Sequence, residues 1–228
     1  MNASQALDSL AFRAKVVRFI GWTFVVLTLL QVGLSGYIAF RPADEIVVTA
    51  GGSTDSMTQM FTLAFLSIGL AILWLLSALA FMIMALVWIY RAHANIVEQG
   101  VPMDHSPGWA VGSYFVPFLN LVVPFRAMRE LYNRSHGEIP EHAHSGVDDV
   151  FAWWTAYMVG FFIQCALLFK LAVNELTNLI IYAPLWMEFA LSSFVFLLFA
   201  TAVLMLIKLV GAITEAQRSS AHVGAAFE

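Results

Sequence analysis

Uncharged apolar stretches long enough to cross a lipid bilayer recur along the chain. A helix needs about 20 predominantly apolar residues to span the hydrocarbon core. Stretches of this length occur at residues 19–40, 61–90, 106–125, 150–169 and 189–207. All but the third are continuous, and they predict membrane-spanning helices at about residues 17–40, 61–90, 150–173 and 184–210.

The third stretch differs because two prolines interrupt it. Pro117 and Pro124 each remove a backbone donor and clash with the preceding turn, so a continuous spanning helix is not expected there. Ser106 and Pro107 have the side chains that favour the N-cap and first turn of a new helix. The sequence therefore predicts a broken helical segment at residues 106–134, which is either re-entrant or lies along the membrane interface.

The second half of this segment has an amphipathic pattern. At helical spacing one face carries Phe125, Met128, Leu131 and Tyr132, and the other faces carry Arg126, Arg129, Glu130 and Arg134. Glu130 and Arg134 also have the i,i+4 spacing of a helical ion pair. Such a pattern is typical of a helix in a membrane interface.

The distribution of basic residues predicts the orientation of the spans. Lysine and arginine are enriched in cytoplasmic loops. With four spans and a cytoplasmic N-terminus, only Arg41 and Lys170 of the 11 basic residues fall outside, which leaves nine inside. We therefore expect an all-α integral membrane protein of the cell inner (plasma) membrane, a single domain over residues 1–228. Both termini and the broken segment are expected on the cytoplasmic side.

Composition agrees with a membrane protein and excludes other classes. Hydrophobic residues make up 61% of the chain and charged residues 11%, with a mean hydropathy of +0.80, which is too apolar for an ordinary soluble domain. The net charge is -4 and no basic block occurs, so nucleic acid is not an expected partner. The single cysteine, Cys165, excludes an intramolecular disulfide and a cysteine metal cluster.

A series of motifs runs from residue 88 to residue 131. It comprises WIYRAHAN at 88–95, SPGWAVG at 106–112, VP at 116–117, NL at 120–121, Pro124 and RAMREL at 126–131. Over roughly residues 60–215 the chain resembles a bacterial membrane family known only as a domain of unknown function, four-three-two-eight. The resemblance implies a multi-pass bacterial membrane protein, and it brings no established activity, cofactor or catalytic residue.

Candidate binding residues gather in this region. The second apolar stretch is longer than a bilayer needs, so its helix is expected to tilt or to protrude into the cytoplasm. Arginines at the interface attract anionic lipid head groups, whereas a broken helix offers backbone carbonyls to an ion or solute. The candidate residues for lipid or solute binding are Arg91, His93, Asn95, Asn120, Arg126, Arg129 and Glu130.

A pair of ionisable residues is expected inside the membrane. Lys170 lies near the outer end of the third span, and Glu188 lies just inside the outer end of the fourth. The two are therefore expected at similar depth, as a structural ion pair or as a gate.

Candidates for catalysis and metal binding are weak. His136, His142 and His144 share a loop with acidic residues, a composition that can bind a metal but is more typical of a solvated loop. The chain contains no nucleophile elbow, phosphate loop or His-Glu-x-x-His helix. We therefore expect no enzyme activity, no metal and no cofactor.

Two functions remain. The first is a non-enzymatic membrane module that binds membrane lipids or a protein partner, either another copy of the chain or a different membrane protein. The alternative is a small-solute or ion transporter, or a channel component, that uses the broken segment at residues 106–134.

Overall fold

The computed structural model describes residues 3–40, 54–138 and 145–225. The long helices are α1 (Ala3–Ala39), α2 (Thr54–Glu98), α5 (Ser145–Leu176) and α6 (Leu185–Ala225). Between α2 and α5 lie the short helices α3 (Pro107–Gly112) and α4 (Val123–Ser135), with the 3-10 turns η2 (Ser113–Phe115) and η3 (Leu119–Leu121) between them. No strand occurs in these ranges, and the expected all-α class is confirmed.

Within the described ranges, four helices are long and apolar enough to cross a membrane. The matching stretches are Gln5–Ala39, Phe61–Glu98, Val147–Leu176 and Leu185–Ser219. They coincide with the expected spans, although α1 begins well before residue 17 and α2 continues past residue 90. Large apolar side chains such as Phe65, Ile72 and Leu75 are exposed on α2. Their exposure fits a surface that contacts lipid.

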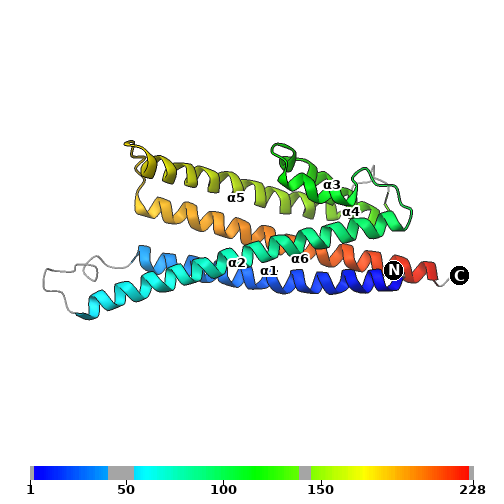
Figure 1. Cartoon of the computed structure of the whole chain (residues 1–228), viewed down its shortest axis with the longest axis horizontal. Helices are drawn as coiled ribbons and strands as arrows, with labels where there is room; N and C mark the ends of the chain where they lie inside the picture. Colours follow the sequence, from blue (N-terminus) through cyan, green and yellow to red (C-terminus); the bar gives the residue numbers. More distant parts are fainter. Residues whose placement is uncertain (1–2, 41–53, 139–144, 226–228) are drawn as a thin grey trace.

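The long helices form a bundle in which α2 crosses α1 and α6 at an angle (Figure 1). α1 packs against α2 and α6, and α5 packs against α6, but α2 and α5 do not pack along each other. Gly21 allows close approach of α1, α2 and α6, because a Cβ there would lie 2.7 Å from Ile207 Cδ1 and 2.9 Å from Phe81 Cε2. The start of α1 and the end of α6 lie at the same end of the bundle, which we call the terminal end (Figure 1).

The broken segment fills the space between α2 and α5 at the terminal end (Figure 1). α3 packs against α2, and α4 packs against α2, α5 and α6. Ala110 of α3 and the side chains of Met128 and Leu131 of α4 belong to the main hydrophobic core. The segment is thus an integral part of the bundle.

Local sequence explains where the segment breaks. The hydroxyl of Ser106 accepts a hydrogen bond from the backbone N–H of Trp109 at 3.3 Å, and Pro107 lies in the first turn of α3, as predicted. After Pro117 the chain turns through Phe118, whose φ of 66° is rare for a residue with a side chain. Pro124 then lies in the first turn of α4, where backbone N–H groups have no acceptor within the helix, so its lack of an N–H breaks no helical hydrogen bond.

Candidate anion-binding site

α4 has one face in the core and another that carries arginines. Met128, Leu131 and Tyr132 are buried, as the amphipathic pattern predicted. Arg126 and Arg129 are exposed. The helix therefore presents positive charge away from the core.

The arginines of α4 line one cavity of about 360 Å³, which we call the arginine cavity. Its walls are formed by Asp104, His105, Arg126, Arg129, Glu130, Asn133 and Arg134. Within the described ranges, no hydrogen bond or ion pair engages the side chain of Arg126, Arg129 or Arg134. Arg134 Nε and Asn133 Oδ1 are buried and have no partner there. The cavity thus offers guanidinium groups whose hydrogen-bonding capacity is unused.

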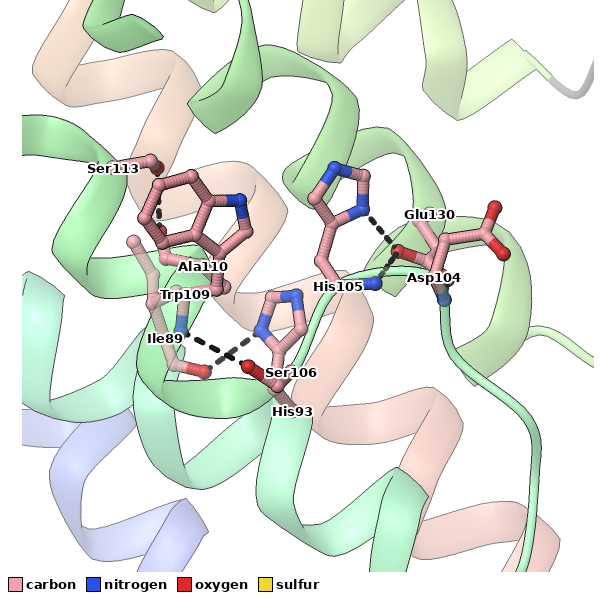
Figure 2. A network of polar contacts seen from close by, with 9 residues as sticks. All are labelled: Ile89, His93, Asp104, His105, Ser106, Trp109, Ala110, Ser113 and Glu130. Carbon is pink, nitrogen blue, oxygen red and sulfur yellow. Dashed lines mark hydrogen bonds and ion pairs between the residues drawn. The ribbon is translucent and has the colours of Figure 1, made fainter. Parts of the chain in front are cut away.

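Glu130 is the acidic residue of α4, and its hydrogen bonds go to the loop after α2. Its Oε1 accepts from the backbone N–H of Asp104. Its Oε2 accepts from the backbone N–H of His105 at 3.2 Å and lies 2.6 Å from His105 Nδ1 (Figure 2). The i,i+4 ion pair expected between Glu130 and Arg134 is not formed, because the loop takes the carboxylate instead. This contact holds the loop against α4 and leaves the guanidinium groups without a carboxylate partner.

His93 and Asn95 lie in the core and do not line the arginine cavity. His93 Nδ1 lies 3.0 Å from the carbonyl of Ile89 in its own helix (Figure 2). Asn95 Nδ2 donates to Gln217 Oε1 at 3.4 Å. Gln217 Nε2 in turn donates to the carbonyl of Ala92 at 3.1 Å and to the hydroxyl of Ser135 at 3.0 Å. This buried network ties α2 and α6 to the end of α4.

Sequence reasoning missed Gln217, Ser135 and His105. A signal was present for Gln217, because Thr214 lies one turn earlier on α6 and the two polar residues share a face of a largely apolar helix. Both contact α2, since Trp88 Nε1 donates to Thr214 Oγ1 at 3.2 Å. No local pattern distinguished Ser135 or His105, whose partners are distant in sequence.

Two other candidates lie away from the arginine cavity. Arg91 forms an ion pair at 3.0 Å with Glu98, which is an exposed residue of the same helix. The N–H of Asn120 donates to the carbonyl of Val116 at 3.0 Å inside the break. The Ser113 carbonyl, which Pro117 deprives of its helical partner, accepts from the N–H of Val116 at 3.4 Å. The break therefore satisfies part of its own backbone.

The histidine loop is described only in part. His136 Nδ1 lies 2.8 Å from the carbonyl of Tyr132, and the two rings are stacked. Burial raises the pKa of Tyr132, and the nearby Asp149 and Glu138 raise it further. Among the described residues, no group of three or more histidine, cysteine or acidic residues is placed to hold a metal ion. The candidates His142 and His144 lie outside the described residues.

Lys170 and Glu188 are in contact toward the end of the bundle opposite the terminal end. Lys170 Nζ donates to Oε1 of Glu188 and so joins α5 to α6. In the turn beyond them, Asn174 accepts from the N–H of Ile181 at 2.8 Å and donates to its carbonyl at 3.3 Å. These contacts close the connection between the two helices.

Together these features describe an all-helical protein with four candidate membrane-spanning helices and a basic cavity beside a broken segment. The chain belongs to the family described as Domain of unknown function (DUF4328), whose profile matches residues 52–215. The match includes the whole broken segment and agrees with the resemblance seen in the motifs of residues 88–131. Searches of curated proteins and of solved structures found no match.

Replacing Glu130 with Gln should loosen the loop at residues 104–105. The amide keeps the size of the carboxylate but has one acceptor oxygen and no charge. Hydrogen bonds to charged groups contribute about 1.5–3 kcal/mol, so we expect the free energy of unfolding to fall by about that amount. Thermal unfolding in detergent measures the effect. Glu98→Gln is the matched control, because the exposed ion pair of Glu98 contributes at most about 1 kcal/mol. An equal loss in both variants would contradict the role assigned to Glu130.

Lys170→Met and Glu188→Gln should each lower the melting temperature more than the double substitution does. A single substitution leaves one charge without its partner in a low-dielectric environment, whereas the double substitution removes both charges. Melting temperatures of the four proteins in the cycle, measured in the same detergent, give the coupling between the two sites. Additive effects would mean that the two residues act independently.

Proposed function

We propose that the protein is a non-enzymatic membrane module that binds a membrane lipid through the phosphate of its head group. The observation that carries this proposal is the arginine cavity, in which Arg126, Arg129 and Arg134 lack partners within the described ranges. Guanidinium groups form paired, charge-assisted hydrogen bonds with phosphate oxygens. Unused donors at one cavity therefore support a ligand with several anionic oxygens.

The proposed lipid requires the arginine cavity to lie at the depth of the head groups. We propose that the broken segment lies along the interface on the cytoplasmic side and does not enter the membrane. The exposed Arg126 and Arg129 support this, because an arginine at the bilayer centre costs at least about 2.5–3.5 kcal/mol. Phe115 and Phe118, exposed at the break, suit the boundary between head groups and acyl chains.

The proposed orientation places both termini in the cytoplasm and the spans in the inner membrane. Its support is the asymmetry of the basic residues, nine of which share one side when four helices cross. In this orientation the arginine cavity faces the leaflet whose anionic lipids attract basic groups most strongly.

Transport of a small solute or ion is the alternative. A hydrated ion needs polar groups along its path between the spans. The cavity between the spans is lined mainly by apolar side chains. That lining supports a lipid ligand over a hydrated one.

Cysteine labelling in intact cells tests the orientation. After Cys165→Ser, a cysteine introduced by Gln99→Cys should be protected from an impermeant thiol reagent, because position 99 follows α2 on the proposed cytoplasmic side. A cysteine introduced by Asn178→Cys, between α5 and α6, should react. Both positions are exposed in the fold, so a difference in labelling between them reports the side of the membrane on which each lies. Labelling at 99 with protection at 178 would reverse the proposed orientation.

Single Arg126→Gln, Arg129→Gln and Arg134→Gln variants should each bind phosphatidylglycerol about tenfold more weakly. Losing a charge-assisted hydrogen bond costs about 1.5–3 kcal/mol, and each 1.4 kcal/mol is about tenfold in affinity. Native mass spectrometry of the detergent-solubilised protein, titrated with the lipid, measures binding. Arg18→Gln is the control, because Arg18 is an exposed arginine of α1 outside the cavity.

Two comparisons make the result specific. An equal loss in the Arg18→Gln variant would mean that surface charge alone attracts the lipid, and the cavity would not be the site. Inorganic phosphate, tested by its effect on the melting temperature, separates a lipid phosphate from a soluble one. Stabilisation by inorganic phosphate together with unchanged lipid binding in the three cavity variants would contradict a lipid ligand.

A further inference from the structure

A second cavity of about 310 Å³ lies between the long helices, and we call it the apolar cavity. It is lined by side chains of α1, α2, α5 and α6 and by the η2 turn. Aromatic rings form much of its wall, among them Phe24, Trp74, Phe81, Trp154 and Phe199. An engineered apolar cavity of about half this size stays dry and binds benzene, so water is a poor occupant here.

The apolar cavity exists because α2 and α5 do not pack along each other. The broken segment fills the space between them at the terminal end, and its Tyr114 and Phe115 form that wall of the cavity. Beyond these residues the space remains between two helices that are apolar enough to cross a membrane. The cavity therefore borders the hydrocarbon of the bilayer, which is the solvent available at this depth.

Two tyrosine hydroxyls line the apolar cavity without a protein partner. Neither the hydroxyl of Tyr114 nor that of Tyr157 forms a hydrogen bond with a residue in the described ranges, although the two rings contact the ring of Trp154. The ring centroids of Tyr114 and Tyr157 lie 6.4 and 5.5 Å from that of Trp154, so the two tyrosines lie in the same part of the wall. Both tyrosines are half-buried, and tyrosine hydroxyls that face an apolar environment usually find a hydrogen-bond partner, so a ligand here is expected to carry an acceptor at this end.

We propose that the apolar cavity binds the hydrocarbon chain of an ester-linked membrane lipid, with the ester carbonyl accepting a hydrogen bond from Tyr114. The chain then extends from Tyr114 toward Phe24 and Trp74 among the spans. The carbonyl lies beside the η2 turn, as the ester of a bilayer lipid lies below its head group. The two cavities share no lining residue, so this site does not depend on the arginine cavity.

Photo-crosslinking tests the chain site. The probe is phosphatidylcholine with a diazirine on its acyl chain, in nanodiscs that hold the full-length protein, and mass spectrometry maps the adducts. Cavity residues at 153–157 and 199–206 should be labelled in the wild type. Ala78→Phe should remove this labelling, because Ala78 lines the cavity and a larger ring fills it. Ala71→Phe should not, because Ala71 is exposed two turns earlier on α2 and lies outside the cavity.

Further comparisons keep the result interpretable. If Ala78→Phe lowers the melting temperature strongly, Ala202→Leu fills the cavity from α6 with a smaller side chain and should have the same effect on labelling. If a cavity-filling variant folds and its cavity residues are still labelled as strongly as in the wild type, the chain site is wrong. Arg18→Gln changes an exposed arginine outside both cavities and should leave the labelling unchanged. The phosphatidylglycerol titration of the arginine variants reports on the arginine cavity separately, so failure of the arginine cavity and failure of the chain site are distinguishable.

The hydrogen bond to the ester carbonyl has its own readout. An ether-linked version of the probe lacks the carbonyl, so it should label the cavity more weakly than the ester-linked probe. Tyr114→Phe should remove this difference without removing the labelling itself. Equal labelling by both probes in the wild type would overturn the role proposed for Tyr114.

Discussion

The carboxylate of Glu130 holds the loop at residues 104–105 onto α4, and the position of the whole broken segment depends on this contact. The side chain of Glu130 is 9% exposed, and a carboxylate so withdrawn from water needs hydrogen-bond donors. The backbone N–H groups of Asp104 and His105 supply them. These groups lie before α3 and have no helical acceptor, so one contact satisfies the acid and two loop donors together. Because the acid is used in this way, the arginines of the same helix have no carboxylate partner on α4.

Gln217 secures the C-terminal end of α4. Its amide nitrogen bonds to α4 through Ser135 and to α2 through the carbonyl of Ala92, and its oxygen accepts from Asn95. Hydrogen bonds in a low-dielectric core are strong, and removing one partner leaves the others unsatisfied. α4 is therefore held at two points, by Glu130 toward the loop and by Ser135, its last residue, toward α6. This attachment fixes which face of the helix, and hence which charges, turns away from the core.

The sequence predicted those features that depend on local chemistry or on length. Apolar runs predicted the four long helices, and Ser106, Pro107 and Pro124 predicted where the broken segment begins its two helices. The amphipathic face of α4 followed from spacing alone. The partner of Glu130 did not follow, because the sequence suggested Arg134 one turn away, whereas the backbone donors of the loop are brought to Glu130 by the tertiary packing of α3 and α4. Arg91 was grouped with the arginines of α4 by charge, yet it bonds along its own helix to Glu98.

The broken segment separates two cavities of opposite chemistry, and this arrangement favours a lipid over a soluble ligand. α4 has 13 residues and is about 20 Å long, well short of the roughly 30 Å of a hydrocarbon core, so it cannot serve as a fifth span. Its arginines line a cavity rich in charge, while Tyr114 and Phe115 of the same segment line a cavity rich in aromatic carbon. A soluble anion would gain nothing from the apolar cavity, and a hydrocarbon would gain nothing from the arginines. A lipid carries both chemistries, so in the proposed interfacial placement the segment would meet the phosphate of a lipid on one side and its chains on the other.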